Sequence, residues 1–330
     1  MTLAPLDALW HPTQPTARRL AYLTLAANVT IVLTGGAVRL TGSGLGCPTW
    51  PECTEGSGGG RGSFVPHGEV DIHGVIEFGN RLLTFGLSAI AIATFVVMWR
   101  LRNSRPTLWR IALVLGLGIP AQALIGGLTV LTDLNPWIVA GHLLVSMGLI
   151  SLSVLLVRRV DESDGPALPT VPRPAIALAI ATYAAVWVVV YLGTVVTGSG
   201  PHAGDEDAPR NGLDPAAMSQ LHTDAVFLLL GLTVGCVFAM WAVDAPRALQ
   251  HAVRWLLAIE LAQGLVGAVQ YATDLPIALV ALHLLGASAI VAAATWTLLR
   301  TRERQAITHG STGENSRTSG SKLTDGQISG

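Results

Sequence analysis

Four histidines lie near one end of long apolar segments, where an ionisable side chain is costly and usually functional. They are His73, His142, His222 and His283. Iron in a porphyrin takes two axial ligands, and neutral imidazole suits that role. A zinc site would need four ligands, usually including cysteine or carboxylate, and no cysteine clusters with these histidines in the sequence. The histidines therefore favour heme binding over a zinc site.

Two cysteines, Cys47 and Cys53, lie close together in the segment Gly-Cys-Pro-Thr-Trp-Pro-Glu-Cys. On an oxidising side of a membrane, a pair this close can form a disulfide. Three roles are open for it: a labile disulfide, exposed in a loop, that exchanges electrons; a purely structural staple; and, less favoured, a copper site. The third cysteine, Cys236, lies within an apolar segment and is expected to be a small buried residue.

The second half of the chain repeats the first half at an offset of 141 residues. The aligned pairs are Ala121-Gln122 with Ala262-Gln263, Gly126 with Gly267, Thr132-Asp133-Leu134 with Thr273-Asp274-Leu275, and His142 with His283. Thr41-Gly42-Ser43-Gly44 also recurs, as Thr197-Gly198-Ser199-Gly200. A polar residue that is duplicated inside an apolar segment usually has a specific role. The pattern therefore predicts two related units that each present a histidine to a cofactor.

Composition indicates a membrane protein, since 51% of the residues are hydrophobic and only 12% are charged, against roughly a quarter charged in soluble domains. Crossing a hydrocarbon core takes about 20 mostly apolar residues per helix. Eight segments qualify: 20–40, 72–98, 108–131, 136–157, 175–197, 217–241, 251–272 and 276–299. The predicted fold is an all-α integral membrane protein whose eight transmembrane helices form two pseudo-symmetric four-helix bundles.

The distribution of basic residues predicts the topology. Of 20 lysines and arginines, 16 fall in alternate connections or in the tails, and such connections are cytoplasmic by the positive-inside rule. We therefore expect a multi-pass protein of the cell membrane with both termini in the cytoplasm. Residues 1–19 have no continuous apolar core, so no cleavable signal peptide is expected. Even-numbered spans then run inward, and the four histidines share one depth near the outer face.

Five parts are predicted along the chain: a cytoplasmic N-terminal segment (1–19), an N-terminal four-helix half (20–157), a polar cytoplasmic linker (158–174), a C-terminal four-helix half (175–299) and a disordered cytoplasmic tail (300–330). The tail is rich in Ser, Thr, Gly and charge, with little to bury. Because each half has an even number of spans, their pseudo-two-fold axis should lie along the membrane normal.

Several motifs together resemble one family. They are the segment 36–53, Gly-Ala-Val-Arg-Leu-Thr-Gly-Ser-Gly-Leu-Gly-Cys-Pro-Thr-Trp-Pro-Glu-Cys, then Ile-Glu-Phe-Gly-Asn-Arg at 76–81, Gln122 with Gly126-Gly127, and Gly141-His142. This set resembles the heme A synthase family over roughly residues 18–300. The resemblance implies an eight-span enzyme that converts heme O to heme A for cytochrome oxidase, oxidising a porphyrin methyl group to a formyl group by successive hydroxylations.

The resemblance also implies two heme sites. His222 and His283 would be the axial ligands of heme b in the C-terminal half. His142 would be the iron ligand in the N-terminal half, the proposed site of the substrate heme, and Asn80 stands where the family's Glu-x-x-His-Arg motif has its histidine. His73 lies about 10 Å further along the helix, so it does not replace that ligand without moving the heme. Our hypothesis is that the N-terminal heme is bound by His142 alone or with weak help, which leaves one iron face open.

Three charged residues complete the predicted site. Glu77 matches the glutamate of the family motif and is expected to be catalytic, by orienting the substrate, moving protons or stabilising positive charge at the reacting carbon. The alternative for Glu77 is an ion pair with Arg81, four residues later. Arg39 and Arg81 are expected to bind heme propionates, for which arginine is well suited; the alternative is that they anchor the topology.

Two other functions remain open: a membrane bis-heme b electron carrier that modifies nothing, and, less favoured, a transporter built from parallel repeats. An electron carrier is expected to have two histidines in each half, which Asn80 argues against. The expected partners are heme O, membrane lipid, heme O synthase and an electron acceptor, with no nucleic acid. Small residues such as Gly116 and Gly118 fit packing within a bundle or between protomers of a homo-oligomer.

Overall fold

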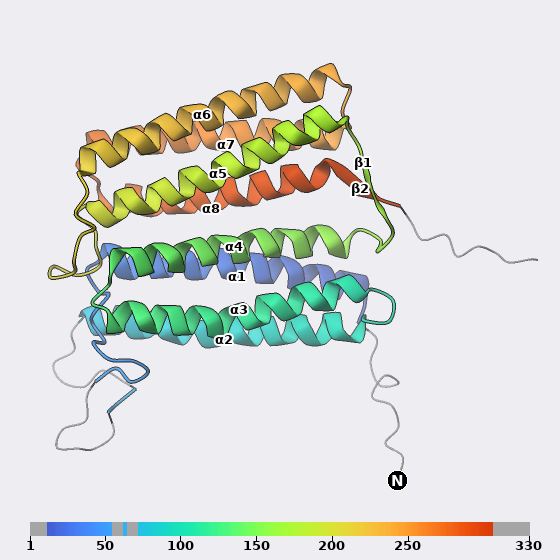
Figure 1. Ribbon diagram of the computed structural model, residues 1–330. Coiled ribbons are helices and arrows are strands. Elements are labelled where there is room, and N and C mark those ends of the chain that lie inside the picture. The colour runs from blue at the N-terminus through green and yellow to red at the C-terminus, as the bar shows by residue number, and fades with distance from the viewer. Residues whose placement is uncertain (1–11, 55–61, 65–71, 306–330) are drawn as a thin grey trace, which may run out of the picture.

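The computed structural model describes residues 12–54, 62–64 and 72–305. Within these residues, eight long helices run alongside one another (Figure 1): α1 Gln14–Leu40, α2 Ile72–Arg100, α3 Pro106–Leu131, α4 Pro136–Val160, α5 Arg173–Ser199, α6 Pro215–Ala242, α7 Arg247–Ala272 and α8 Ile277–Arg300. Each helix is long and apolar enough to cross a membrane. The prediction of an all-α fold with eight membrane-spanning helices is confirmed.

Most helices extend a few residues beyond the predicted spans, because capping residues start a helix before its apolar run begins. Asp214 caps α6 by accepting a hydrogen bond from the backbone N–H of Ala217 (2.6 Å), and Pro215 follows as the first helical residue. Thr13, whose side chain accepts a hydrogen bond from the backbone N–H of Thr16, starts α1 in the same way, with Pro15 in the first turn. A proline in the first turn has no N–H that needs an intrahelical partner. The polar residues next to each apolar run can therefore become helical without leaving backbone donors unpaired.

The repeated Thr-Asp-Leu motif forms the same turn in both halves. Asp133 and Leu134, between α3 and α4, have φ values of 50° and 59°, and Asp274 and Leu275, between α7 and α8, have values of 58° and 59°. Two consecutive non-glycine residues with positive φ are uncommon. The duplicated sequence therefore encodes a duplicated helical hairpin, with a histidine-bearing helix following each turn.

The helices fall into two groups, which lie one above the other in Figure 1. In the first group α1 contacts α2 and α4, and α3 contacts the same two helices; in the second group α5 contacts α6 and α8, as does α7. Between the groups, α4 contacts α5 and α8, and α1 contacts α8. Val32, Met147, Val186, Leu229 and Val291 belong to one buried cluster, so the central core draws on both groups.

Two short strands join the predicted linker to the start of the predicted tail. Ala167–Pro169 (β1) pairs antiparallel with Arg302–Arg304 (β2), at the opposite end of the helices from the α3–α4 turn (Figure 1). The prediction that residues 302–304 are disordered is therefore wrong. Their side chains are polar, but their backbone groups pair with the linker, and Arg304 also donates to the carbonyl of Gly165 (2.7 Å). Residues 306–330 lie outside the described residues.

One of the two small residues singled out in α3 packs inside its own group of helices. A Cβ at Gly118 would lie 2.6 Å from Cδ2 of Leu149 on α4, so no larger residue fits there unless the Leu149 side chain moves. A Cβ at Gly116 would meet nothing within 4 Å. Gly118 thus serves close helix packing between α3 and α4.

Candidate functional site

Three of the four singled-out histidines face a glycine on the preceding helix. A Cβ at Gly126 of α3 would lie 3.3 Å from Cε1 of His142 on α4. The equivalent pairs are Gly193 of α5 with His222 of α6, at 3.3 Å, and Gly267 of α7 with His283 of α8, at 3.2 Å. At each position an added Cβ would lie closer to the imidazole than ordinary van der Waals contact. Because glycine has no Cβ, it leaves the space that the imidazole occupies. The repeat pointed to Gly126 and Gly267, whereas Gly193 was missed because it falls outside the aligned motifs.

The same three imidazoles have an unused ring nitrogen. Nδ1 of His142, His222 and His283 is buried and has no hydrogen-bond partner, although the Val189 carbonyl is near enough to interact with the His222 ring. Leaving a buried polar group unpaired costs about 1–3 kcal/mol. Imidazoles that the protein itself does not use fully are suited to bind a ligand, and the donor set fits heme iron.

His222 and His283 come together from helices that lie diagonally across the second group. The two side chains are close enough to interact electrostatically, and α6 and α8 each contact α5 and α7 on either side. Both imidazoles therefore belong to the interior of this group. Two imidazoles at matching depth fit the axial positions of one heme.

Asn80 occupies the corresponding place in the first group. It lies on α2, diagonal to the His142 helix α4, and its Nδ2 is 4.0 Å from the position of a Cβ at Gly35 of α1. Its Oδ1 is buried and unpaired. The first group therefore combines one imidazole with one carboxamide, where the second group has two imidazoles.

Two glutamines tie the histidine-bearing helices to their neighbours. Gln122 Nε2 of α3 donates to the backbone carbonyl of His142 (3.1 Å), and Gln263 Nε2 of α7 donates to the carbonyl of His283 (2.6 Å). The repeated Ala-Gln motif thus has a structural role in both halves. It fixes the helix that carries the imidazole against the helix that carries the facing glycine.

We predict that Gly267→Leu lowers the heme content of the purified protein at least about tenfold, because a side chain at this position must displace the His283 ring, and overpacking costs about 1–3 kcal/mol. Heme content per purified protein, measured by absorbance of the pyridine complex, checks this. Gly264→Leu is the matched control, since a Cβ there would meet nothing within 4 Å. Equal heme contents in the two variants would contradict the steric argument.

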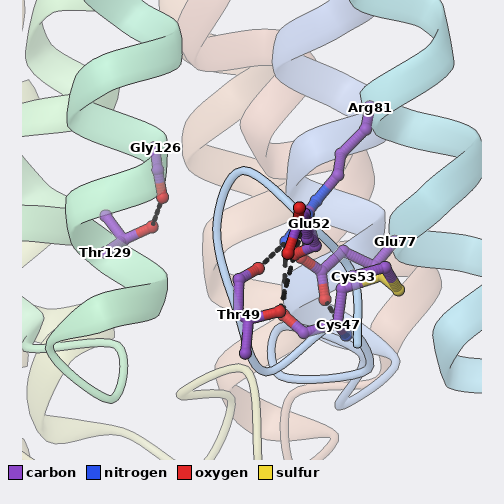
Figure 2. A network of polar contacts seen from close by, with 8 residues as sticks. All are labelled: Cys47, Thr49, Glu52, Cys53, Glu77, Arg81, Gly126 and Thr129. Atoms are coloured by element: carbon purple, nitrogen blue, oxygen red, sulfur yellow. Dashed lines mark hydrogen bonds and ion pairs between the residues drawn. A yellow bond between two sulfur atoms is a disulfide. The ribbon is translucent and has the colours of Figure 1, made fainter. Parts of the chain in front are cut away.

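The loop between α1 and α2 contains a disulfide between Cys47 and Cys53. Both cysteines are 0% exposed, so the idea of a disulfide exposed in the loop is wrong. Figure 2 shows this cysteine loop, residues 47–53, between α2, which carries Glu77 and Arg81, and α3, which carries Gly126. The disulfide closes the loop at its base, and the residues packed around it bury both cysteines.

Glu77 and Arg81 form the ion pair considered as the alternative for Glu77. Arg81 Nη2 lies 2.5 Å from Glu77 Oε1, and Glu77 Oε2 accepts a hydrogen bond from the backbone N–H of Cys47 (2.7 Å). Arg81 Nη2 also donates to the carbonyls of Cys47 and Thr49, both at 3.2 Å. The pair therefore holds the backbone of the cysteine loop, with Glu77 only 5% exposed. Arg81 as a propionate ligand stays a prediction.

The other two predicted site residues, Arg39 and His73, also bind connections between helices. Arg39 donates through Nε to the carbonyl of His202 (2.7 Å) and through Nη2 to that of Thr197 (3.1 Å). It therefore links the end of α1 to the end of α5 and to the α5–α6 connection. His73 Nδ1 lies 3.0 Å from Ser43 Oγ, which ties His73 to the connection that leads into the cysteine loop.

Trp50, at the tip of the cysteine loop, packs on α3. A Cβ at Gly127 would lie 2.5 Å from Cδ2 of the Trp50 indole, and the adjacent Gly126 faces His142. In the Gly126-Gly127 pair, Gly126 therefore packs against the His142 imidazole and Gly127 against the Trp50 indole. The sequence signal for this contact was the glycine pair, but its partner in a distant loop was not apparent.

The fold and site define a polytopic membrane protein with interior imidazoles suited to heme. Residues 18–57 and 66–210 match the family model described as cytochrome oxidase assembly protein (COX15-CtaA), and the chain belongs to this family. It is 32% identical over 190 residues to the heme A synthase of Lysinibacillus sphaericus, covering 54% of this chain and 58% of that protein. It is 26% identical over 243 residues to the heme A synthase of Shouchella clausii, covering 70% and 77%. With the heme A synthase of Listeria innocua, identity is 32% over 148 residues, covering 43% and 45%.

Proposed function

We propose that this protein is a heme A synthase, which oxidises the porphyrin methyl group of heme O to a formyl group by successive hydroxylations and supplies heme A to cytochrome oxidase. The observation that carries the proposal is the set of glycine-backed, incompletely paired imidazoles in a chain of this family. Relatives that share 26–32% identity bear the name heme A synthase, although the first of these matches covers less than two thirds of the relative.

In the proposed division of labour, the C-terminal half (175–299) retains heme b. His222 and His283 would hold it between α6 and α8, with Gln263 fixing the backbone of His283. A bound heme supplies a redox-active iron. The protein's part is to provide two neutral imidazoles at one depth and to keep water away from them, which the packing of α5 to α8 supports.

The N-terminal half (20–157) would hold the substrate heme through His142. Asn80 gives this half a carboxamide where the other half has an imidazole, and carboxamides are weaker iron ligands than imidazole. His73 is already bonded to Ser43, which argues against its serving as a strong second ligand. We therefore infer that this half would hold the iron of the substrate heme through one strong protein ligand, His142.

Glu77 would act beside the substrate through its carboxylate. Its second role is to keep the cysteine loop in place, since it binds the Cys47 amide and Arg81 binds two loop carbonyls. With Trp50 packed on α3, the loop covers the outer end of the N-terminal half and limits access of water to the reacting carbon. Arg39 and Arg81 remain candidates for the propionates.

The membrane setting is part of the proposal. The chain would lie in the cell membrane with both termini in the cytoplasm, as the arginine distribution predicts. Heme O would come from heme O synthase through the lipid phase, and an electron acceptor would remove the reducing equivalents. The cysteine loop would then face the outer side.

Expression of the chain in cells that make heme O, followed by extraction and chromatography of the hemes, tests the function. We expect heme A in cells with the intact protein and only heme O in cells with the empty vector. Bound heme b with unchanged heme O would support a bis-heme electron carrier instead and would overturn the proposed function.

A further inference from the structure

A single carboxyl group, that of Glu260, lies in the middle of α7. Glu260 is 3% exposed and its Oε1 accepts a hydrogen bond from the hydroxyl of Thr233 on α6 (2.9 Å), a residue that is 0% exposed. Its Oε2 is buried and has no hydrogen-bond partner. A buried carboxyl at this depth is expensive, and such groups are usually functional.

No cation faces this carboxyl from the helices packed against it. On α6, Cys236 interacts electrostatically with Glu260, and it is the only ionisable residue between Asp224 and the end of that helix. On α8, the segment between His283 and Arg300 contains no ionisable side chain, and on α7 Glu260 is alone between Arg254 and Tyr271. An ionised carboxylate here would need its positive counterpart from elsewhere.

The first half has no equivalent of this group. At the 141-residue offset that aligns His283 with His142, Glu260 aligns with Ile119, which is 9% exposed. The helical fold therefore does not require a carboxyl at this position. The carboxyl at this position therefore occurs only in the half that contains the facing pair His222 and His283.

Glu260 is also connected to that pair of imidazoles along one face of α7. Gln263, three residues later, donates to the carbonyl of His283, and Gly267, seven residues later, faces the His283 ring. Residues at these spacings share a helix face. Seven residues correspond to about 10 Å along the helix, a range over which charges in a poorly polarisable interior still interact.

We propose that Glu260 is a proton-binding site that balances the charge of a heme held by His222 and His283, an inference that rests on the proposed function. A ferric porphyrin core has one net positive charge and a ferrous core has none, so the ferric state stabilises the Glu260 carboxylate. On reduction, one electron from a reductant such as dithionite enters the iron and one proton from solvent binds Glu260. No bond of the porphyrin is formed or broken.

Redox titration of the purified holoprotein from about pH 5 to about pH 9 tests this, with heme b absorbance as the signal. We expect the midpoint potential to fall with rising pH by up to about 59 mV per pH unit, the value for one proton per electron. In Glu260→Gln, which keeps the shape and can still accept from Thr233, the potential should be higher at alkaline pH and independent of pH. Reduced-minus-oxidised infrared spectra should show a carboxylic acid C=O band that this variant lacks.

Glu162→Gln is the matched control, because Glu162 lies outside the spans and pairs with Arg158 (2.7 Å); it should retain the wild-type pH dependence. A heme-loaded wild type whose potential does not vary with pH, or a Glu260→Gln variant that keeps the variation, would overturn this inference alone. A chain without histidine-dependent heme b would overturn the proposed function as well, and heme content distinguishes these results.

Discussion

Replacement of either His222 or His283 with alanine is expected to remove the low-spin signal of the heme b that we propose these residues bind. Each imidazole would supply one axial ligand, and removal of a group that merely supports a metal ligand already costs about 10- to 100-fold in affinity. We therefore expect heme b content to fall by at least about tenfold in both variants. Optical spectra of the reduced protein and the pyridine complex give the content directly.

His251→Ala is the control for these substitutions, because His251 lies on an exposed face near the start of α7, away from the imidazole pair. It should keep the full heme b content. If the His222→Ala and His283→Ala proteins also kept the full heme b content, the proposal that these two imidazoles bind heme would be wrong.

Glu77→Gln is expected to lower the yield of heme A by at least about 100-fold, the lower range for loss of a positioned acid or base. The substitution also removes the charge that Arg81 pairs with. Breaking a buried ion pair costs about 3–5 kcal/mol, and less here because the Arg81 side chain is 23% exposed. The ratio of heme A to heme O in membrane extracts measures the effect on turnover.

Proteolysis of the cysteine loop separates the two contributions of Glu77. A loosened cysteine loop is cut faster, whereas loss of chemistry alone leaves the cutting rate unchanged. Glu206→Gln, an exposed substitution of the same type in the α5–α6 connection, should alter neither readout. A wild-type yield of heme A from the Glu77→Gln protein would show that Glu77 takes no part in the reaction.

The sequence was sufficient for the helices because long apolar runs leave few alternatives to a spanning helix. The repeat also identified His142 and His283 correctly as equivalent positions, since each follows the same Thr-Asp-Leu turn and faces a glycine. Neither inference depended on long-range contacts. Both depended on local properties of the chain, namely hydrophobic length and turn conformation.

Contacts between distant segments could not be predicted in this way. Trp50 packs against Gly127 only because the cysteine loop folds over α3, and no periodic pattern connects the two. Arg302–Arg304 form a strand through backbone pairing, to which their polar side chains gave no clue. Likewise, Arg39 donates hydrogen bonds to the Thr197 and His202 carbonyls. Its side-chain chemistry had suggested a carboxylate partner, namely a heme propionate.

The asymmetry between the halves is the main feature of this molecule. A repeated helical arrangement places His222 and His283 in one half and Asn80 and His142 in the other. The cysteine loop, with its Glu77 and Arg81 contacts, belongs to the half that has the single imidazole. The buried carboxyl of Glu260 belongs to the half that has two. We infer that one half retains a heme while the other half transforms one.

Heme extraction from His142→Ala protein, expressed with a source of heme O, is the decisive test of these two roles. We expect that heme b remains bound at the wild-type level, that heme A is absent, and that heme O accumulates. Heme A at the wild-type level, or loss of heme b together with heme A, would contradict the division of labour between the two halves.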